Sequence, residues 1–159
     1  MKHVVGIADM KISTVPDDVI VTYAIGSCMG IYACDRKAGV GGVLHVMMPE
    51  ARINVEKAGA NPFMFVDTGL PRFIDELKKL GALPSQLTVK IAGGAQLGNG
   101  TNNGYNVGKC NDTAVREMLG KMGLKIESGD TGGASTRTMY AEAGTGKVTL
   151  NTAGELKEI

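Results

Sequence analysis

One cysteine and one histidine occur where strand-like segments end. Cys28 closes the apolar segment VIVTYAIGSC, in which Gly26 and Ser27 precede the thiol. His45 lies within a second apolar segment, VLHVMMP, which ends at a proline. A thiolate attacks carbonyl carbon readily, and a neighbouring imidazole is the usual means of raising the thiolate fraction at neutral pH. These two residues therefore predict thiol-dependent hydrolysis.

Further residues are placed to complete such a site. A turn predicted at 35–39 allows the segments that carry the thiol and the imidazole to form a hairpin. Thr22 precedes Cys28 by an even number of residues, which favours one strand face for both, and its hydroxyl is a candidate to orient the imidazole. Backbone N–H groups around Gly26, Ser27 and Cys28 are candidates for stabilising an oxyanion.

Each of these residues also has an ordinary structural interpretation. Free cysteine is among the most buried residue types, so Cys28 also fits a small core residue. His45 fits a hydrogen-bonded core histidine, and Thr22 fits the packing of a β-branched residue in a strand. Cys34 and Cys110 carry no signal beyond packing, and we predict that they are structural.

Composition excludes several classes of partner. The chain has 159 residues and a formal net charge of +1. This charge gives no broad attraction to nucleic acid or to an anionic membrane, so we expect neither nucleic-acid binding nor membrane insertion. The N-terminal residues lack the pattern of a secretory signal, which favours a cytoplasmic location. The length favours a single domain spanning residues 1–159.

The sequence predicts no metal and no cofactor. Cys28 and Cys34 are separated by five residues, which is not the spacing of a zinc knuckle, and a second half-site is missing. The segment 144–147, GTGK, resembles a phosphate-binding loop only in part. It has Ala141 where the first glycine is required and Val148 where serine or threonine is required.

Hydrophobic periodicity predicts a chain made mostly of strands. We expect eight of them, at 2–8, 19–25, 29–34, 42–48, 88–92, 124–127, 136–142 and 147–151. An amphipathic helix is predicted over 62–81, with Asn61 as its cap and a bend at Pro71. Its apolar stripe is predicted from residues spaced three or four apart: Phe63, Val66, Leu70, Phe73, Ile74 and Leu77. A second helix is predicted over 111–122. The glycine-rich segment 98–104 is predicted to be a polar loop.

Five short motifs resemble, in order, those of the CheD family of chemoreceptor glutamine deamidases. The similarity spans roughly residues 2–150. The motifs are Gly26-Ser27-Cys28, HVMMP at 45–49, KIAGGA at 90–95, NVGKCN at 106–111, and DTGG at 130–133 with Arg137.

This resemblance implies an α/β fold, a mixed and antiparallel β-sandwich with two helices packed on one sheet face, shared with the cytotoxic necrotizing factor deamidases. It implies a catalytic set of Cys28, His45 and Thr22 that hydrolyses glutamine side chains of methyl-accepting chemotaxis receptors without a cofactor. A CheC-type phosphatase is the implied partner. Two alternatives stay open: a weakly catalytic or non-catalytic module that binds such a phosphatase, and a thiol-dependent esterase or amidase with other substrates.

Overall fold

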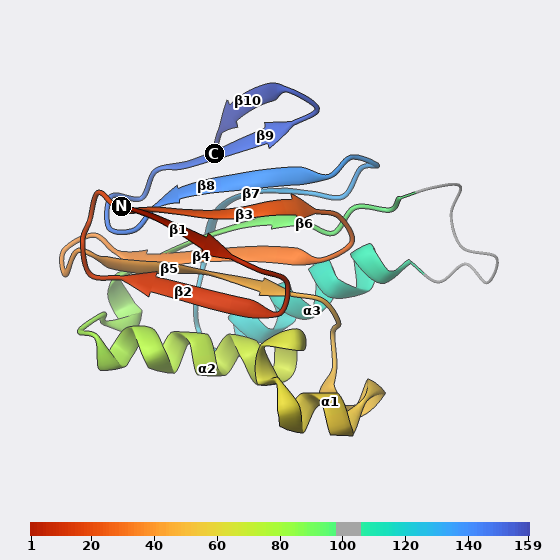
Figure 1. The fold of residues 1–159 in the computed structure, drawn as a ribbon. Coiled ribbons are helices and arrows are strands. Elements are labelled where there is room, and N and C mark those ends of the chain that lie inside the picture. The colour runs from red at the N-terminus through yellow and green to blue at the C-terminus, as the bar shows by residue number, and fades with distance from the viewer. Residues whose placement is uncertain (98–105) are drawn as a thin grey trace.

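The residues that the structure describes form two five-stranded sheets that stack face to face (Figure 1). The computed structural model describes residues 1–97 and 106–159. The first sheet has the order β1-β3-β8-β9-β10, with strands Lys2–Val5, Val19–Ile25, Arg137–Glu142, Val148–Thr152 and Glu155–Glu158. The second has the order β2-β5-β4-β6-β7, with strands Asp9–Ser13, Val40–Val46, Met29–Asp35, Leu87–Gly93 and Ile126–Thr131.

Each sheet combines parallel and antiparallel pairs. Strand β1 runs parallel to β3, and β6 runs parallel to β7, whereas the other neighbours are antiparallel. The predicted mixed sandwich is therefore confirmed. The turn at 35–39 does join β4 to β5, and Gly39 closes it by donating its N–H to the Asp35 carbonyl.

Two long helices cover the outer face of the second sheet, as the resemblance implied. They are α2 (Val66–Lys79) and α3 (Val107–Lys121), and both lie on the side of the second sheet that faces away from the first (Figure 1). The short helix α1 (Val55–Ala60) and the 3-10 turns Ala51–Ile53 and Pro62–Met64 precede α2, and a third 3-10 turn, Pro84–Gln86, precedes β6. Within the described residues, no helix is long and apolar enough to span a membrane.

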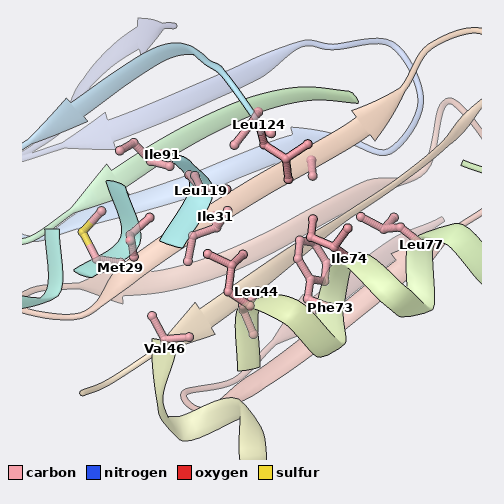
Figure 2. Close-up of a cluster of buried hydrophobic side chains, with 14 of the residues drawn as sticks. Met29, Ile31, Leu44, Val46, Phe73, Ile74, Leu77, Ile91, Leu119 and Leu124 are labelled. Atoms are coloured by element: carbon pink, nitrogen blue, oxygen red, sulfur yellow. The ribbon is translucent and has the colours of Figure 1, made fainter. Parts of the chain in front are cut away.

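The second sheet is buried on both faces, which explains its long apolar runs. Along β4, Ile31 and Ala33 face the helices, whereas Tyr32 and Cys34 face the first sheet. Figure 2 shows the helix-side layer, where Leu44 and Val46 of β5 point toward α2 and Phe73, Ile74 and Leu77 of α2 point back. The inter-sheet layer contains mainly Ile20, Ile25, Tyr32, Val43, Met139 and Leu150.

Both long helices begin at residues other than those predicted. Asn61 caps the 3-10 turn that follows it, and α2 begins only at Val66. Helix α3 begins at Val107 rather than at 111, because the Asn106 side chain accepts a hydrogen bond from the Lys109 N–H and so acts as the cap. The predicted buried stripe of α2 is confirmed from Val66 onward, and the helix continues through Pro71.

Several strand boundaries also differ from the prediction, among them β5, which spans Val40–Val46 rather than 42–48. The predicted strand 2–8 stops at Val5, and the polar strand β2 that follows it was not predicted. Strand β7 runs to Thr131 rather than 127, because it pairs with β6 as far as Gly93. The exposed edge strand β10 was also not predicted, since its sequence ELKE lacks apolar alternation. The predicted polar loop at 98–104 lies outside the described residues.

Candidate active site

A hydrogen bond between a hydroxyl and an imidazole joins the two sheets in the interior. Thr22 on β3 and His45 on β5 are both fully buried, and 2.7 Å separates Thr22 Oγ1 from His45 Nδ1. The Thr22 hydroxyl also donates to the Val5 carbonyl oxygen at 3.0 Å. Since the single hydroxyl hydrogen is used there, Oγ1 accepts from His45, so Nδ1 carries the ring proton. The lone pair of the imidazole is therefore on Nε2.

The Nε2 atom of His45 is buried and has no hydrogen-bond partner among the residues that the structure describes. Burial also lowers the pKa of His45 from 6.5 to about 4, because the charged ring would lose its hydration. At neutral pH the ring is a neutral base with an unused acceptor. A buried acceptor without a partner is costly, and such atoms occur where function requires them.

Cys28 lies beside the strand that carries His45. In the antiparallel ladder between β4 and β5, Gly30 pairs with His45 and Met29 pairs with Val46. Cys28 directly precedes β4 and packs against the inter-sheet core, on the side that His45 faces. Gly30 places no side chain between them. The register therefore places Cys28 diagonally across from His45, one residue beyond the end of the ladder.

The thiol and the imidazole rest uncharged. Within the described chain, Cys28 Sγ and His45 Nε2 do not form a hydrogen bond. Burial raises the pKa of the half-buried Cys28 thiol, and the residue's own backbone N–H offsets this in part. A raised thiol pKa and a lowered imidazole pKa both oppose a preformed thiolate–imidazolium pair. An uncharged resting pair is compatible with a catalytic role, because catalytic hydrogen bonds often tighten only when substrate binds.

Three hydrogen bonds to backbone carbonyls hold the turn that carries the thiol. The Ala95 N–H donates to the Gly26 carbonyl at 2.9 Å, and the Gly94 N–H donates to the Cys28 carbonyl at 2.8 Å. The Ser27 carbonyl accepts from Asn111 Nδ2 at 2.8 Å. These three hydrogen bonds fix the backbone conformation of the turn.

A glycine at the end of β6 makes this close approach possible. Gly93 has φ of +122°, and a Cβ atom there would lie 2.3 Å from the Cys28 carbonyl oxygen. The Gly93 carbonyl accepts from the Gly132 N–H at 2.9 Å and from the buried Arg137 guanidinium at 3.2 Å. The quoted motifs at 90–95 and 130–133 therefore meet directly behind the Cys28 turn.

The even offset between Thr22 and Cys28 does not explain their placement, so that reasoning was wrong. A bulge shifts the register between Thr22 and Ile25, where Ala24 has φ of +53°, and so breaks the alternation. The chain then crosses from the first sheet to the second. Thr22 lies on the first sheet and Cys28 lies directly before a strand of the second, and Thr22 meets His45 because the sheets stack.

A small pocket opens beside the turn. It has a volume of about 200 Å³ and is lined by Ser27, Ala95, Gln96, Leu97, Asn106, Val107 and Gly108. A larger hollow of about 640 Å³ lies between α3 and the turn Ala51–Ile53, and Cys110 is on its wall. The larger hollow includes none of the candidate site residues, so the small pocket is the better candidate for substrate entry. Across the described ranges, no group of three metal-ligating side chains occurs.

The buried imidazole predicts a characteristic pH dependence of stability. The folded-state pKa of His45 is about 4, below its value of 6.5. As the pH falls from 6.5 toward 4, the unfolded chain binds a proton that folded His45 does not, so the folded state loses stability. In the unaltered chain this loss should approach about 3 kcal/mol. His45→Gln should not show it, because glutamine takes up no proton. Urea unfolding of both proteins at pH 7.5 and pH 4.5 measures the difference, and parallel pH profiles would contradict the assignment.

The fold and the site together define a class: an α/β sandwich with a half-buried thiol at a strand start beside a buried, hydroxyl-oriented imidazole. The model of a family described as CheD chemotactic sensory transduction matches residues 47–152, which follow the candidate residues in the chain. Relatives matched over nearly the full length support the same assignment. The chain belongs to the CheD family, as its motifs predicted.

Three such relatives carry the name probable chemoreceptor glutamine deamidase CheD. The protein of Desulforamulus reducens is 43% identical over 94% of this chain and 90% of its own length. The protein of Thermococcus kodakarensis is 40% identical over 100% of this chain and 98% of its own. The protein of Solibacter usitatus is 36% identical over 98% of this chain and 92% of its own.

Proposed function

We propose that this chain hydrolyses glutamine side chains of methyl-accepting chemotaxis receptors to glutamate, releasing ammonia, with Cys28 as nucleophile. The observation that carries the chemistry is the orientation of His45. Thr22 Oγ1 accepts a hydrogen bond from His45 Nδ1–H, with 2.7 Å between the two heavy atoms, which leaves the Nε2 lone pair free beside the strand that begins after Cys28. The names of the relatives supply the substrate.

The first half of the reaction makes a thioester. As Cys28 Sγ bonds to the glutamine Cδ, its proton passes to His45 Nε2, and the carbonyl electron pair moves onto the substrate oxygen. Backbone N–H groups of the Gly26–Cys28 turn stabilise that oxyanion. When the oxyanion collapses, the C–N bond breaks and His45 returns the proton to the leaving nitrogen, which departs as ammonia.

The second half restores the enzyme. Water replaces ammonia beside His45, which removes a proton from it as the oxygen attacks the thioester carbon. Collapse of the second tetrahedral intermediate breaks the C–S bond, and the thiol regains the proton from His45. The product is glutamate. Throughout both halves Thr22 keeps the ring in one tautomer, as the third member of a nucleophile–base–orienter set does.

The small pocket beside Ser27 suits this substrate. Its volume of about 200 Å³ is below the usual range for cofactor and drug-sized ligands and fits a single inserted side chain. Selection among receptor glutamines would then depend on contacts around the pocket.

The direct test is mass spectrometry of a purified receptor cytoplasmic fragment after incubation with the protein. Each converted glutamine adds about one mass unit and releases one ammonia, and peptide sequencing locates the converted residues. A fragment that stays unmodified, while the protein hydrolyses thiol-reactive esters, would favour the esterase alternative instead.

Thr22 supplies a graded test of the orienting bond. Thr22→Val replaces the hydroxyl by a methyl group of similar size, so the buried Nδ1–H of His45 loses its acceptor. We expect kcat for deamidation to fall about 10- to 100-fold, since loss of a partner that orients a reactive group typically costs that much. Thr22→Ser keeps the hydroxyl and should restore most of the rate. Equal rates for the valine and serine variants would show that the hydroxyl has no part in the reaction.

The remaining expectations are part of the proposal. We propose a cytoplasmic location, a single folded unit over 1–159, and association with a CheC-type phosphatase. Co-purification with such a phosphatase from one cell extract, compared with the Cys28→Ala variant, tests whether partner binding is independent of the thiol. Binding without any deamidation by the unaltered chain would favour the regulatory-module alternative.

A further inference from the structure

Asn111 connects the two strand ends that carry the proposed nucleophile and base. It is fully buried on α3, and its Nδ2 group donates to the Ser27 carbonyl at 2.8 Å and to the Met47 carbonyl at 2.8 Å. The β4–β5 ladder ends at the pair Met29 and Val46, so these carbonyls lie just beyond it. The Asn111 amide therefore bridges β4 and β5 just beyond the point where their backbone pairing ends.

The Ser27 bond has a consequence for the backbone of the turn. No peptide bond in the described chain is cis, so within each peptide plane the N–H points opposite to the C=O. Asn111 binds the Ser27 carbonyl, and the Cys28 N–H therefore points away from α3. In the same way, Ala95 binds the Gly26 carbonyl and turns the Ser27 N–H outward.

No other residue in the described ranges accepts a hydrogen bond from these two N–H groups. Among the described residues, neither the Ser27 nor the Cys28 N–H donates to another residue. Both residues are half-buried. Two neighbouring N–H donors beside a nucleophile, with no other residue bound to them, can form an oxyanion hole, which works because its donors are aligned before the charge develops.

We propose that Asn111 is a positioning residue that aligns this oxyanion hole and sets the spacing between Cys28 and His45. It touches neither substrate nor reacting atoms, and it acts through the Ser27 and Met47 carbonyls. The inference rests on the proposed function. A simple core role accounts poorly for Asn111, because its Oδ1 is buried without a partner in the part of the chain described, which makes it costly as packing.

The test separates oxyanion stabilisation from thiol reactivity. Asn111→Leu has a similar shape but donates no hydrogen bond, so both carbonyls lose their restraint. We expect kcat for receptor deamidation to fall about 100-fold, comparable to loss of one oxyanion donor. KM and the rate of Cys28 alkylation by iodoacetamide should stay within about threefold, because alkylation at a CH₂ group develops no oxyanion.

Two further variants keep the result interpretable. Asn111→Ser leaves room for a water that satisfies both carbonyls, and it serves if the leucine variant does not fold. Val115→Ala, one turn further on the same buried face of α3, creates a cavity and is the control for general destabilisation. We expect Val115→Ala to lower Tm without the selective loss of kcat.

The outcomes are distinct. If deamidation and alkylation fall together, in proportion to Tm as in Val115→Ala, Asn111 is only structural and the inference is overturned. If both Asn111 variants keep the kcat of the unaltered chain, the inference is also overturned, while the proposed function stands. If the unaltered chain does not deamidate the fragment, the proposed function itself fails, whatever the Asn111 variants do.

Discussion

Cys28→Ala is expected to lower receptor deamidation by at least about 10⁴-fold, leaving a folded protein with no detectable ammonia release. The loss is this large because the thioester route needs a thiol at this atom, and the residues that line the pocket include the Ser27 hydroxyl but no second thiol. The half-buried thiol starts with a pKa raised by burial, so attack also depends on its proton being removed during the step. Mass spectrometry of the receptor fragment, with circular dichroism to verify folding, measures the effect.

The other cysteines provide a matched control. Cys110 is also half-buried and free, but it lines the larger hollow beside α3. Cys110→Ala should therefore keep deamidation within about twofold of the unaltered chain, as for a surface substitution away from the reacting atoms. A Cys28→Ala variant that retains the full rate, or a Cys110→Ala variant that loses it, would show that the nucleophile has been misplaced.

His45→Gln is expected to lower kcat by about 10³-fold or more, with little change in the resting reactivity of Cys28. Glutamine retains a polar side chain near Thr22 but takes up no proton at neutral pH, so the attacking thiol loses its base. Because the pKa of His45 is lowered to about 4 and that of Cys28 is raised, no ion pair activates the thiol before substrate binds. Iodoacetamide alkylation should therefore have a similar pH profile in both proteins.

The chain's other histidine is the control for this substitution. His3 on β1 bonds through Nε2 to the Asp18 carboxylate at 2.8 Å, a contact separate from the Thr22–His45 pair. His3→Gln should leave deamidation unchanged within about twofold. If His45→Gln instead suppresses alkylation at pH 7 as strongly as deamidation, the resting state is a thiolate–imidazolium pair and the proton transfer we describe is wrong.

Local pattern and local chemistry predicted much of this molecule. The apolar runs predicted β3 and the fully buried strands β4 and β5, because strands covered on both faces, as β4 and β5 are, contain few polar residues. The spacing of Val66, Leu70 and Phe73 predicted the face of α2 that packs on the second sheet. Edge strands β2 and β10 escaped prediction: β10 is exposed throughout and lacks apolar alternation, and β2 is only partly buried and has only five residues.

The residues themselves, by type and order, determined which chemistry is available: a thiol after Gly26 and Ser27, an imidazole 17 residues later, and motifs that define the family. Tertiary structure alone decided how these groups meet. Thr22 and His45 lie on different sheets, and Asn111 binds the Cys28 turn from a helix. A bulge after Thr22 breaks the alternation of side chains from which one strand face was predicted for Thr22 and Cys28. Periodicity describes contacts along one element, whereas these hydrogen bonds depend on how separate elements stack.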